Sequence, residues 1–229
     1  MSEIGGLYVI IDPAACRGRD PVAVARQALE GGASLLQWRD KVREKGLQLP
    51  EARSVFDLCI RAGRMLFVND HADLALALLI GYGRVPGAGS SGARRAPLLG
   101  VHAGQKDLPV AALRRILPRS IAIGASTNDV AEARRAVADG AAYVAVGDIF
   151  GTRSKTGTRA ASPQRLAEVR KAVDVPVFGI GGIDASNARR VMEAGADGVA
   201  VISAVCGAKD PRAAAAELAE IVARYRRGQ

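Results

Sequence analysis

Short apolar runs alternate with longer amphipathic segments along this chain, and this alternation limits the possible folds more than any other feature. The amphipathic segments, such as DPVAVARQALEGG and TNDVAEARRAVADG, open on a residue that caps helices and close on Gly. Apolar strands that alternate with helices form a parallel sheet covered by helices. Eight runs are predicted as strands: LYVIID (7–12), LLQWRD (35–40), MLFVND (65–70), LLGVHAG (98–104), IAIGAST (121–127), YVAVGDIF (143–150), VPVFGIGG (175–182) and GVAVISA (198–204).

Eight strand–helix units favour a closed (β/α)8 barrel, the TIM barrel, over an open sheet. Three similar turns, GGAS, DGAA and AGAD, each follow a predicted helix and precede a predicted strand, which indicates one repeating plan. A Rossmann-like sheet is the alternative, but IIDPAACRGRD at the end of the first strand lacks the GxGxxG of that fold. We therefore predict an α/β protein with a TIM (β/α)8 barrel, as a single domain over residues 1–229.

One segment, GYGRVPGAGSSGARRAP at 81–97, interrupts this plan. It is rich in Gly, Ser, Pro and Arg and lies between the third helix and the fourth strand. In a TIM barrel, the helix-to-strand side contributes to stability and the opposite side carries the active site. We expect a flexible surface insertion at about 81–97; an interaction loop is the alternative.

The net charge of +9 indicates which partners to expect. Lys and Arg are spread along the chain, aromatic residues make up only 4%, and no nucleic-acid-binding motif is present, so a positive field that gathers small anions is the favoured interpretation. No apolar run reaches the ~18 residues of a membrane span, and the N-terminal MSEIGGLYVIID does not resemble a signal peptide. Three scattered cysteines fit a reducing compartment. We expect a cytoplasmic protein without nucleic-acid or membrane partners; whether it forms a homo-oligomer stays open.

Polar residues stand at the carboxyl ends of the predicted strands, where a TIM barrel places its active site. In QWRDK (37–41), strand alternation puts Gln37, Arg39 and Lys41 on one face. The following strand ends supply further polar residues: Asn69 and Asp70; His102, Gln105 and Asp107; Ser126 and Thr127; and Thr152, Ser154 and Lys155.

The ends of the last two strands predict a phosphate site. GIGGI (179–183) leaves backbone N–H groups unshielded at Gly181 and Gly182, and we expect the next helix to begin near Asp184 or Ser186. With Ser203 on the last strand, this pattern matches the phosphate site that TIM barrels build after strands seven and eight. The alternative is that the glycines only relieve crowding at the turn.

Asp70 and Asp107 are candidate Mg²⁺ ligands, because Mg²⁺ prefers carboxylate oxygens completed by substrate phosphates and water. Each could instead cap the helix that follows it. Cations at neighbouring strand ends imply a polyanion, most simply a diphosphate bound with Mg²⁺. We assign His102 a supporting role, with general base as the alternative. Two anion sites indicate transfer from a diphosphate donor to a phosphorylated acceptor.

These residues lie in motifs that resemble those of the thiamine-phosphate synthase (thiamine-phosphate pyrophosphorylase) family, in the order of that family. The resemblance covers the chain except 81–97. It implies a TIM-barrel transferase that joins 4-amino-5-hydroxymethyl-2-methylpyrimidine diphosphate to 4-methyl-5-(2-phosphoethyl)thiazole. The matching motifs are LLQWRDK, LFVNDHADLAL, GVHAGQKDLP, IGAST, YVAVGDIFGTRSKTG, PVFGIGGI and GADGVAVISA.

The resemblance also implies a role for each matching residue. It assigns the Mg²⁺ ion to Asp70 and Asp107. The residues implied to contact the pyrimidine diphosphate are Gln37, Arg39, Lys41, Asn69, Ser126 and Lys155, of which Arg39, Lys41 and Lys155 would be catalytic. Those implied to receive the thiazole phosphate are Thr152, Ser154, Gly181, Gly182, Ile202 and Ser203.

Three departures from the family pattern stand out. Lys106 replaces an acidic residue beside Asp107, Asp148 replaces proline and adds negative charge near an anion site, and the 81–97 insertion replaces a short turn. We expect no loss of metal binding from Lys106, and we regard Asp148 as the change of most consequence. Two other functions stay open: a related thiazole tautomerase without the diphosphate site, and a non-catalytic sensor of phosphate ligands.

Overall fold

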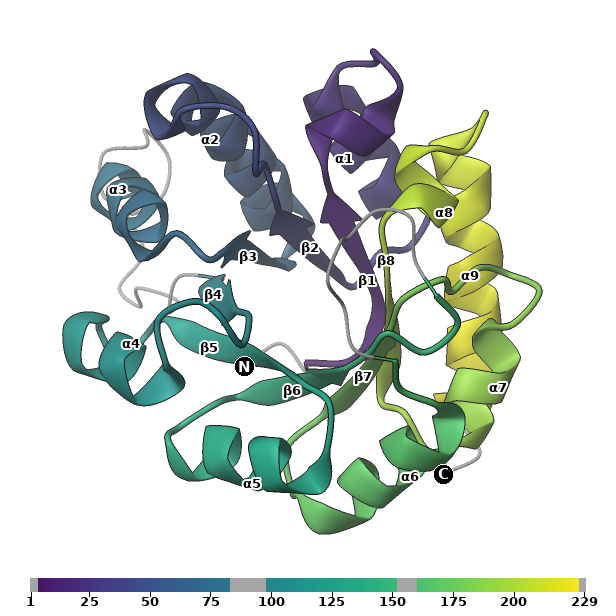
Figure 1. Ribbon diagram of the computed structural model, residues 1–229. Helices are drawn as coiled ribbons and strands as arrows, with labels where there is room; N and C mark the ends of the chain where they lie inside the picture. Colours follow the sequence, from purple (N-terminus) through teal and green to yellow (C-terminus); the bar gives the residue numbers. More distant parts are fainter. Residues whose placement is uncertain (1–3, 83–97, 152–159, 227–229) are drawn as a thin grey trace.

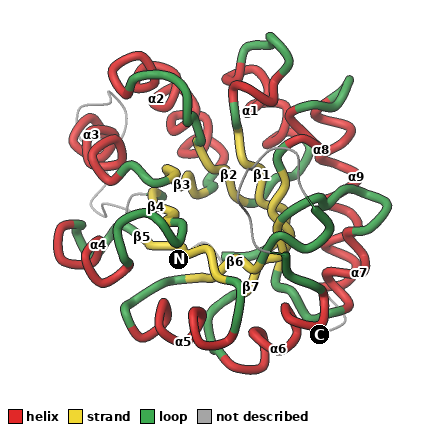
Figure 2. Tube along the Cα trace, viewed as in Figure 1, coloured by secondary structure: helices red, strands yellow, loops and turns green. Residues whose placement is uncertain are grey.

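The computed structural model describes residues 4–82, 98–151 and 160–226. Within these ranges it is a closed barrel in which each strand pairs in parallel with the next, and the eighth strand pairs with the first (Figure 1). Helices surround the strands, as the tube in Figure 2 shows. The predicted TIM (β/α)8 barrel is therefore confirmed.

Seven of the eight strands end earlier than the apolar runs predict, and the fifth ends at the predicted residue. They are β1 (Gly6–Ile11), β2 (Leu35–Trp38), β3 (Met65–Asn69), β4 (Leu99–Ala103), β5 (Ala122–Thr127), β6 (Tyr143–Val146), β7 (Val177–Ile180) and β8 (Gly198–Val201). The predictions that the sixth strand reaches 150 and the eighth reaches 204 are wrong. Ile149 and Ile202 are buried without being in a strand, because apolar character reports burial rather than strand pairing.

Several helices begin at the capping residues that the sequence predicts. Asp20 accepts hydrogen bonds from the backbone N–H groups of Val22 and Ala23, and Ser162 accepts one from Arg165. The helical segments are the 3-10 turn η1 (Pro13–Cys16) and the helices α1 (Pro21–Glu30), α2 (Lys45–Ala62), α3 (Ala72–Tyr82), α4 (Val110–Ile116), α5 (Val130–Ala138), α6 (Pro163–Ala172), α7 (Ala188–Glu193), α8 (Ser203–Cys206) and α9 (Pro211–Arg226).

Helix α2 begins at Lys45, so it has a first turn that precedes Pro50. This first turn is anchored by Gln48, which is buried. The Gln48 amide accepts from the indole N–H of Trp38 at 3.3 Å and donates to the backbone carbonyls of Arg43 at 2.6 Å and Asp40 at 3.3 Å. This one side chain ties the start of α2 to the loop that follows β2.

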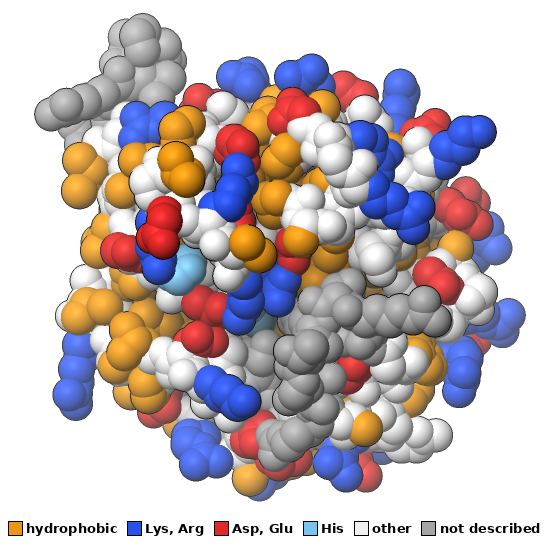
Figure 3. Space-filling view, turned by 45° about the horizontal axis from the view of Figure 1, so that its top comes forward, with side chains coloured by type: hydrophobic (Ala, Val, Ile, Leu, Met, Phe, Trp, Pro, Cys, Tyr) orange, Lys and Arg blue, Asp and Glu red, His pale blue; other side chains and the backbone are white. Residues whose placement is uncertain are grey.

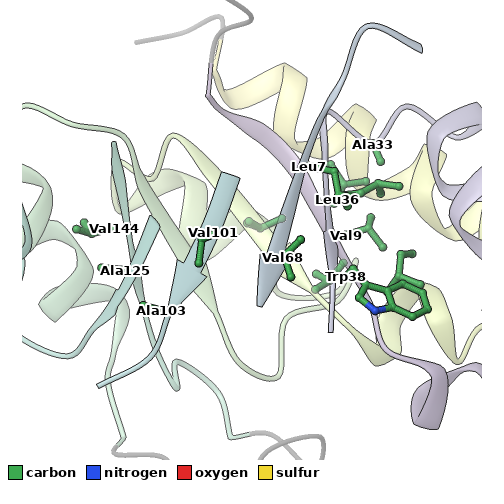
Figure 4. Close-up of a cluster of buried hydrophobic side chains, with 14 of the residues drawn as sticks. Leu7, Val9, Ala33, Leu36, Trp38, Val68, Val101, Ala103, Ala125 and Val144 are labelled. Atoms are coloured by element: carbon green, nitrogen blue, oxygen red, sulfur yellow. The ribbon is translucent and has the colours of Figure 1, made fainter. Parts of the chain in front are cut away.

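The barrel has an outer and an inner apolar layer. Val9, Leu36, Trp38 and Val68 belong to the outer layer, between strands and helices (Figure 4). Alternate residues of the same strands point inward. The inner layer is centred on four aromatic rings, with neighbouring centroids 5.0 to 5.9 Å apart: Tyr8, Phe67, Tyr143 and Phe178.

The predicted insertion falls almost wholly outside the described residues. Its first two positions, Gly81 and Tyr82, belong to α3, and 83–97 is not described. None of the helices in the described ranges combines the length and apolar character needed to cross a membrane.

The inner layer needs glycine where a ring crosses a neighbouring strand. A Cβ on Gly100 would overlap the ring of Phe67 and lie 2.9 Å from the carbonyl oxygen of Ala122. We therefore expect Gly100→Ala to lower the free energy of unfolding by about 1–3 kcal/mol, as overpacking does, measured by urea denaturation. Gly46→Ala in α2 is the matched control, since a Cβ there meets nothing within 4 Å. Equal unfolding midpoints for the two variants would contradict this account of the inner layer.

Candidate active site

The carboxyl ends of β3 and β4, with the loop after β2, bring four predicted site residues together: Lys41, Asn69, Asp70 and Asp107. The Lys41 ammonium lies 2.9 Å from Oδ2 of Asp70, and the Asn69 amide donates to the same oxygen at 2.6 Å. The Asp70 and Asp107 side chains also contact each other. Figure 3 shows acidic, basic and histidine side chains close together on one face of the molecule.

The two carboxyl groups differ in acidity. Burial raises the pKa of Asp70, but its contacts with Lys41 and Asp107 outweigh burial, so that pKa lies below the ordinary value. Burial, followed by contact with Asp70, raises the pKa of Asp107 above the ordinary value. Two carboxyl groups that share one location in this way are stabilised as anions by a bound cation.

The donor set fits Mg²⁺. Within the described ranges no group of three or more acidic, histidine or cysteine side chains could hold a metal ion, so the chain supplies two carboxylates there. Mg²⁺ often binds one or two carboxylates and takes its other ligands from substrate phosphates and water. The alternative in which Asp107 caps α4 is wrong, because Pro109 occupies the cap position and Asp107 accepts instead from the backbone N–H of Gly104 at 3.0 Å.

Arg39 forms an ion pair with Asp12, which follows β1. Both side chains are more than nine-tenths buried, with 9% and 8% of their surface exposed. The Arg39 Nε atom is buried and has no hydrogen-bond partner in the described part of the chain. Arg39 is thus held toward β1, whereas Lys41 reaches Asp70. Sequence reasoning missed Asp12, which looks like an ordinary residue before a Pro turn.

The inside of the barrel contains a continuous hydrogen-bonded series of side chains. The Gln37 amide donates to the Tyr8 hydroxyl at 2.7 Å, and the Tyr8 and Tyr143 hydroxyls lie 2.9 Å apart. Nδ1 of His102 lies 2.8 Å from the Tyr143 hydroxyl, and its Nε2 lies 2.8 Å from Oγ of Ser126. Sequence reasoning missed both tyrosines; the available signal was a hydroxyl on the inward face of an apolar strand.

A cavity of about 700 Å³ opens where the loops after β1, β7 and β8 meet. It brings together Gly182 and Ser203, as the sequence predicts for a phosphate site. Arg17 adds a cation that the sequence reasoning did not single out; it follows η1 with φ of 54°. The lining residues are Asp12, Ala14, Ala15, Arg17, Gly151, Gly182, Ile183, Asp184, Ser203, Ala204 and Gly207.

Two local predictions about this cavity are wrong. The helix expected near Asp184 or Ser186 begins at Ala188, because the Asp184 carboxylate closes a turn with the backbone N–H of Ser186 at 2.9 Å. Ser203 is not at the end of a strand but is the first residue of α8, directly after Ile202.

Asp148 lies beside the predicted phosphate site. It is buried, and a Cβ on Gly181 would overlap its carboxylate. Gly181 also has φ of 103°, which disfavours any side chain. The structure therefore places the added negative charge against the backbone of the glycine turn. The remaining predicted residues, Thr152, Ser154 and Lys155, lie outside the described residues.

Comparison with known proteins identifies the family. Its model, described as thiamine monophosphate synthase, matches residues 7–205. A thiamine-phosphate synthase of Chloroflexus aurantiacus is 41% identical over 94% of this chain and 92% of its own, and one of Methanocella arvoryzae is 40% identical over 96% of each. A solved thiamine phosphate pyrophosphorylase from Pyrococcus furiosus superposes with a TM-score of 0.80 at 34% identity, covering 96% of both chains. The chain therefore belongs to the thiamine monophosphate synthase family.

Proposed function

We propose that this protein is a thiamine-phosphate synthase that transfers a pyrimidinylmethyl group from a diphosphate donor to a thiazole phosphate. The donor is 4-amino-5-hydroxymethyl-2-methylpyrimidine diphosphate, the acceptor is 4-methyl-5-(2-phosphoethyl)thiazole, and diphosphate is released. The contact of Lys41 with Asp70 and of Asp70 with Asp107 carries the proposal, because it joins a cation to a carboxylate pair at the carboxyl end of the barrel. The cavity beside Ser203 lies at the same end.

The diphosphate binds where cationic and amide donors follow β2 and β3. Lys41 and Arg39 supply charge-assisted hydrogen bonds to its oxygens, and Asn69 supplies a neutral one. Lys41 is half-exposed and free to turn toward a ligand, whereas Arg39 stays anchored by Asp12. Asp70 and Asp107 hold Mg²⁺. When bound, this ion adds positive charge that stabilises the leaving diphosphate.

The thiazole phosphate binds in the cavity after β7 and β8. Gly182 offers a backbone N–H group, Ser203 offers a hydroxyl, and Arg17 offers a cation. Gly181 belongs to the same turn, with the Asp148 carboxylate against it. Ile202 belongs to the inner apolar layer and directly precedes Ser203. The acceptor is thereby held by its phosphate, which leaves its ring directed toward the centre of the barrel.

The chemistry needs little from the protein beyond position and charge. The amino group of the pyrimidine pushes electrons toward the exocyclic carbon, so the C–O bond to diphosphate breaks and the ring nitrogen of the thiazole attacks with its own lone pair. No residue must act as a nucleophile or remove a proton from the acceptor. Holding the two substrates in the reactive geometry lowers the activation free energy by up to ~7–11 kcal/mol in favourable cases. Cations around the leaving diphosphate supply the electrostatic part of the rate enhancement.

Two other functions make different demands on the site. A thiazole tautomerase would need the phosphate cavity but not the cluster of Lys41, Asp70 and Asp107. A sensor of phosphate ligands would need neither a carboxylate pair nor a buried Arg39. The synthase uses all of these groups, which favours it over both alternatives. We further propose that the chain acts as a single domain and, because its three thiols are free and buried, that it works in the reducing cytoplasm.

The function is tested by supplying the purified protein with both substrates and Mg²⁺. We expect thiamine phosphate to accumulate, detected by its fluorescence after oxidation, and to depend on both substrates. Chelation by EDTA should stop the reaction and added Mg²⁺ should restore it, because the departing diphosphate loses and regains its counter-charge. Binding of the thiazole phosphate without any product would exclude the synthase and favour the tautomerase or the sensor.

The carboxylate pair is tested by Asp107→Asn. We expect kcat/KM to fall by at least about 100-fold, the loss seen when one group that stabilises transition-state charge is removed. Asp174→Asn is the matched control, because Asp174 is exposed and precedes β7 at the opposite end of the barrel. Diphosphate release measures the rates. An unchanged Mg²⁺ requirement in Asp107→Asn would place the metal on other residues.

The acidity of Asp107 predicts how Mg²⁺ binding depends on pH. Since its pKa is raised, protons compete with the metal at a higher pH than at an ordinary aspartate. We expect Mg²⁺ affinity, measured without diphosphate because diphosphate itself takes up protons near neutral pH, to fall as the pH is lowered from about 7.5 to about 4. The fall should begin above the pH range in which an unperturbed Asp takes up its proton. Calorimetric titration across this range measures it; a constant affinity would contradict the assignment.

A further inference from the structure

Three buried side chains connect the two residues expected to touch the pyrimidine. Gln37 and Ser126 form the ends of the hydrogen-bonded series inside the barrel, and Tyr8, Tyr143 and His102 form its middle. The five residues come from five different strands, β2, β1, β6, β4 and β5. The middle three have no role so far in the proposed reaction.

We propose that Tyr8, Tyr143 and His102 are positioning residues that fix which end of the series donates a hydrogen bond to the substrate and which end accepts one. The ligand named in this inference, an aminopyrimidine, rests on the proposed function. The proton order within the series rests on the structure alone.

The proton order follows from the number of protons each group carries. The Gln37 nitrogen donates to the Tyr8 hydroxyl and has no lone pair to accept with. A phenol has one proton, and the other partner of Tyr8 is the Tyr143 hydroxyl. Tyr8 therefore donates to Tyr143.

Counting protons in the same way gives the direction of the remaining hydrogen bonds, as far as Ser126. Tyr143, having accepted from Tyr8, donates its proton to Nδ1 of His102. A neutral imidazole then carries its proton on Nε2, which donates to Oγ of Ser126. The hydroxyl proton of Ser126 is then available to donate to a ligand. The carbonyl oxygen of Gln37 is available to accept from one.

The two ends consequently have opposite character. Gln37 offers an acceptor and Ser126 a donor, and an aminopyrimidine carries both an amino donor and ring-nitrogen acceptors. Turning the Gln37 amide over would reverse every bond in the series, so that Gln37 would donate and Ser126 would accept. A mixed state, with an acceptor at both ends, would leave one buried donor of the series without an acceptor, at a cost of about 1–3 kcal/mol.

The surroundings keep the series intact. Tyr8 and Tyr143 are fully buried, and their rings meet edge-on with centroids 5.9 Å apart. Burial raises the pKa of each phenol far above neutral pH, so both hydroxyls keep their protons. A Cβ on Gly124 would overlap the Tyr143 ring, which shows how closely that strand approaches it.

The proton order is tested by the ¹⁵N chemical shifts of the histidine ring nitrogens, at a pH of about 8.5, where an ordinary imidazole is neutral. The chain has two histidines, so His71→Asn identifies the His102 signals by difference. We expect the Nε2–H tautomer of His102 in the wild-type protein and a mixture of tautomers in Tyr143→Phe, where Nδ1 has lost its donor. An Nδ1–H tautomer in the wild type, or unchanged shifts in Tyr143→Phe, would overturn the proposal.

The effect on the reaction is tested with Tyr143→Phe and, as a second break in the same series, Tyr8→Phe. We expect KM for the pyrimidine diphosphate to rise about fivefold to tenfold, the factor that corresponds to one well-placed hydrogen bond, with KM for the thiazole phosphate unchanged. Tyr225→Phe in α9 is the matched control, because Tyr225 loses the same atom at a distance from the series. Equal rises for both substrates would show that the tyrosines only support the fold.

The two tests separate this inference from the proposed function. If the wild-type protein forms no thiamine phosphate, the function is wrong, and the ring shifts of His102 still decide the proton order. If product forms while the shifts or the KM values contradict the expectation, the function stands and the positioning role is wrong.

Discussion

The parallel pairing of β1 with β8 closes the barrel, and the arrangement of the site depends on this closure. Gly6 pairs with Gly198 in that register, and a Cβ on Gly198 would overlap the backbone of Gly6. Closure brings Asp12, after the first strand, into the cavity that Ser203 lines after the last. Asp12 also holds Arg39, so residues from both ends of the chain meet at one mouth. An open sheet with the same strands would leave these groups apart.

The sequence sufficed to predict the barrel because apolar strand patterns and amphipathic helix patterns alternate regularly along it. It did not define where the strands and helices end. Val146 ends a strand although Ile149 beyond it is buried, since a loop that folds back over the barrel can be as apolar as the strand. Helix α2 begins at Lys45 because Gln48 finds one partner at the end of β2 and two in the loop that follows it, and those contacts are tertiary. A local pattern carries no information about such partners.

The residues of the candidate site were likewise predictable only in part. Lys41, Asp70 and Asp107 were recognisable because charged groups at strand ends have few structural reasons to be there. Tyr8 and Tyr143 were not, because each contributes one hydroxyl to an otherwise apolar strand and its partner lies on a strand distant in sequence. The pairing of Arg39 with Asp12 was likewise invisible, because it joins neighbouring strands across a helix. Long-range polar contacts are what sequence reasoning lacks here.

Trp38, the chain's single tryptophan, shares its hydrogen-bond partner Gln48 with the loop that carries Lys41. Its indole is buried in the outer apolar layer and is hydrogen-bonded to the first turn of α2. Tryptophan emission in this protein therefore comes from one position, three residues before Lys41, the lysine proposed to bind diphosphate. Trp38 fluorescence can therefore follow events at the proposed diphosphate side of the site without any added label.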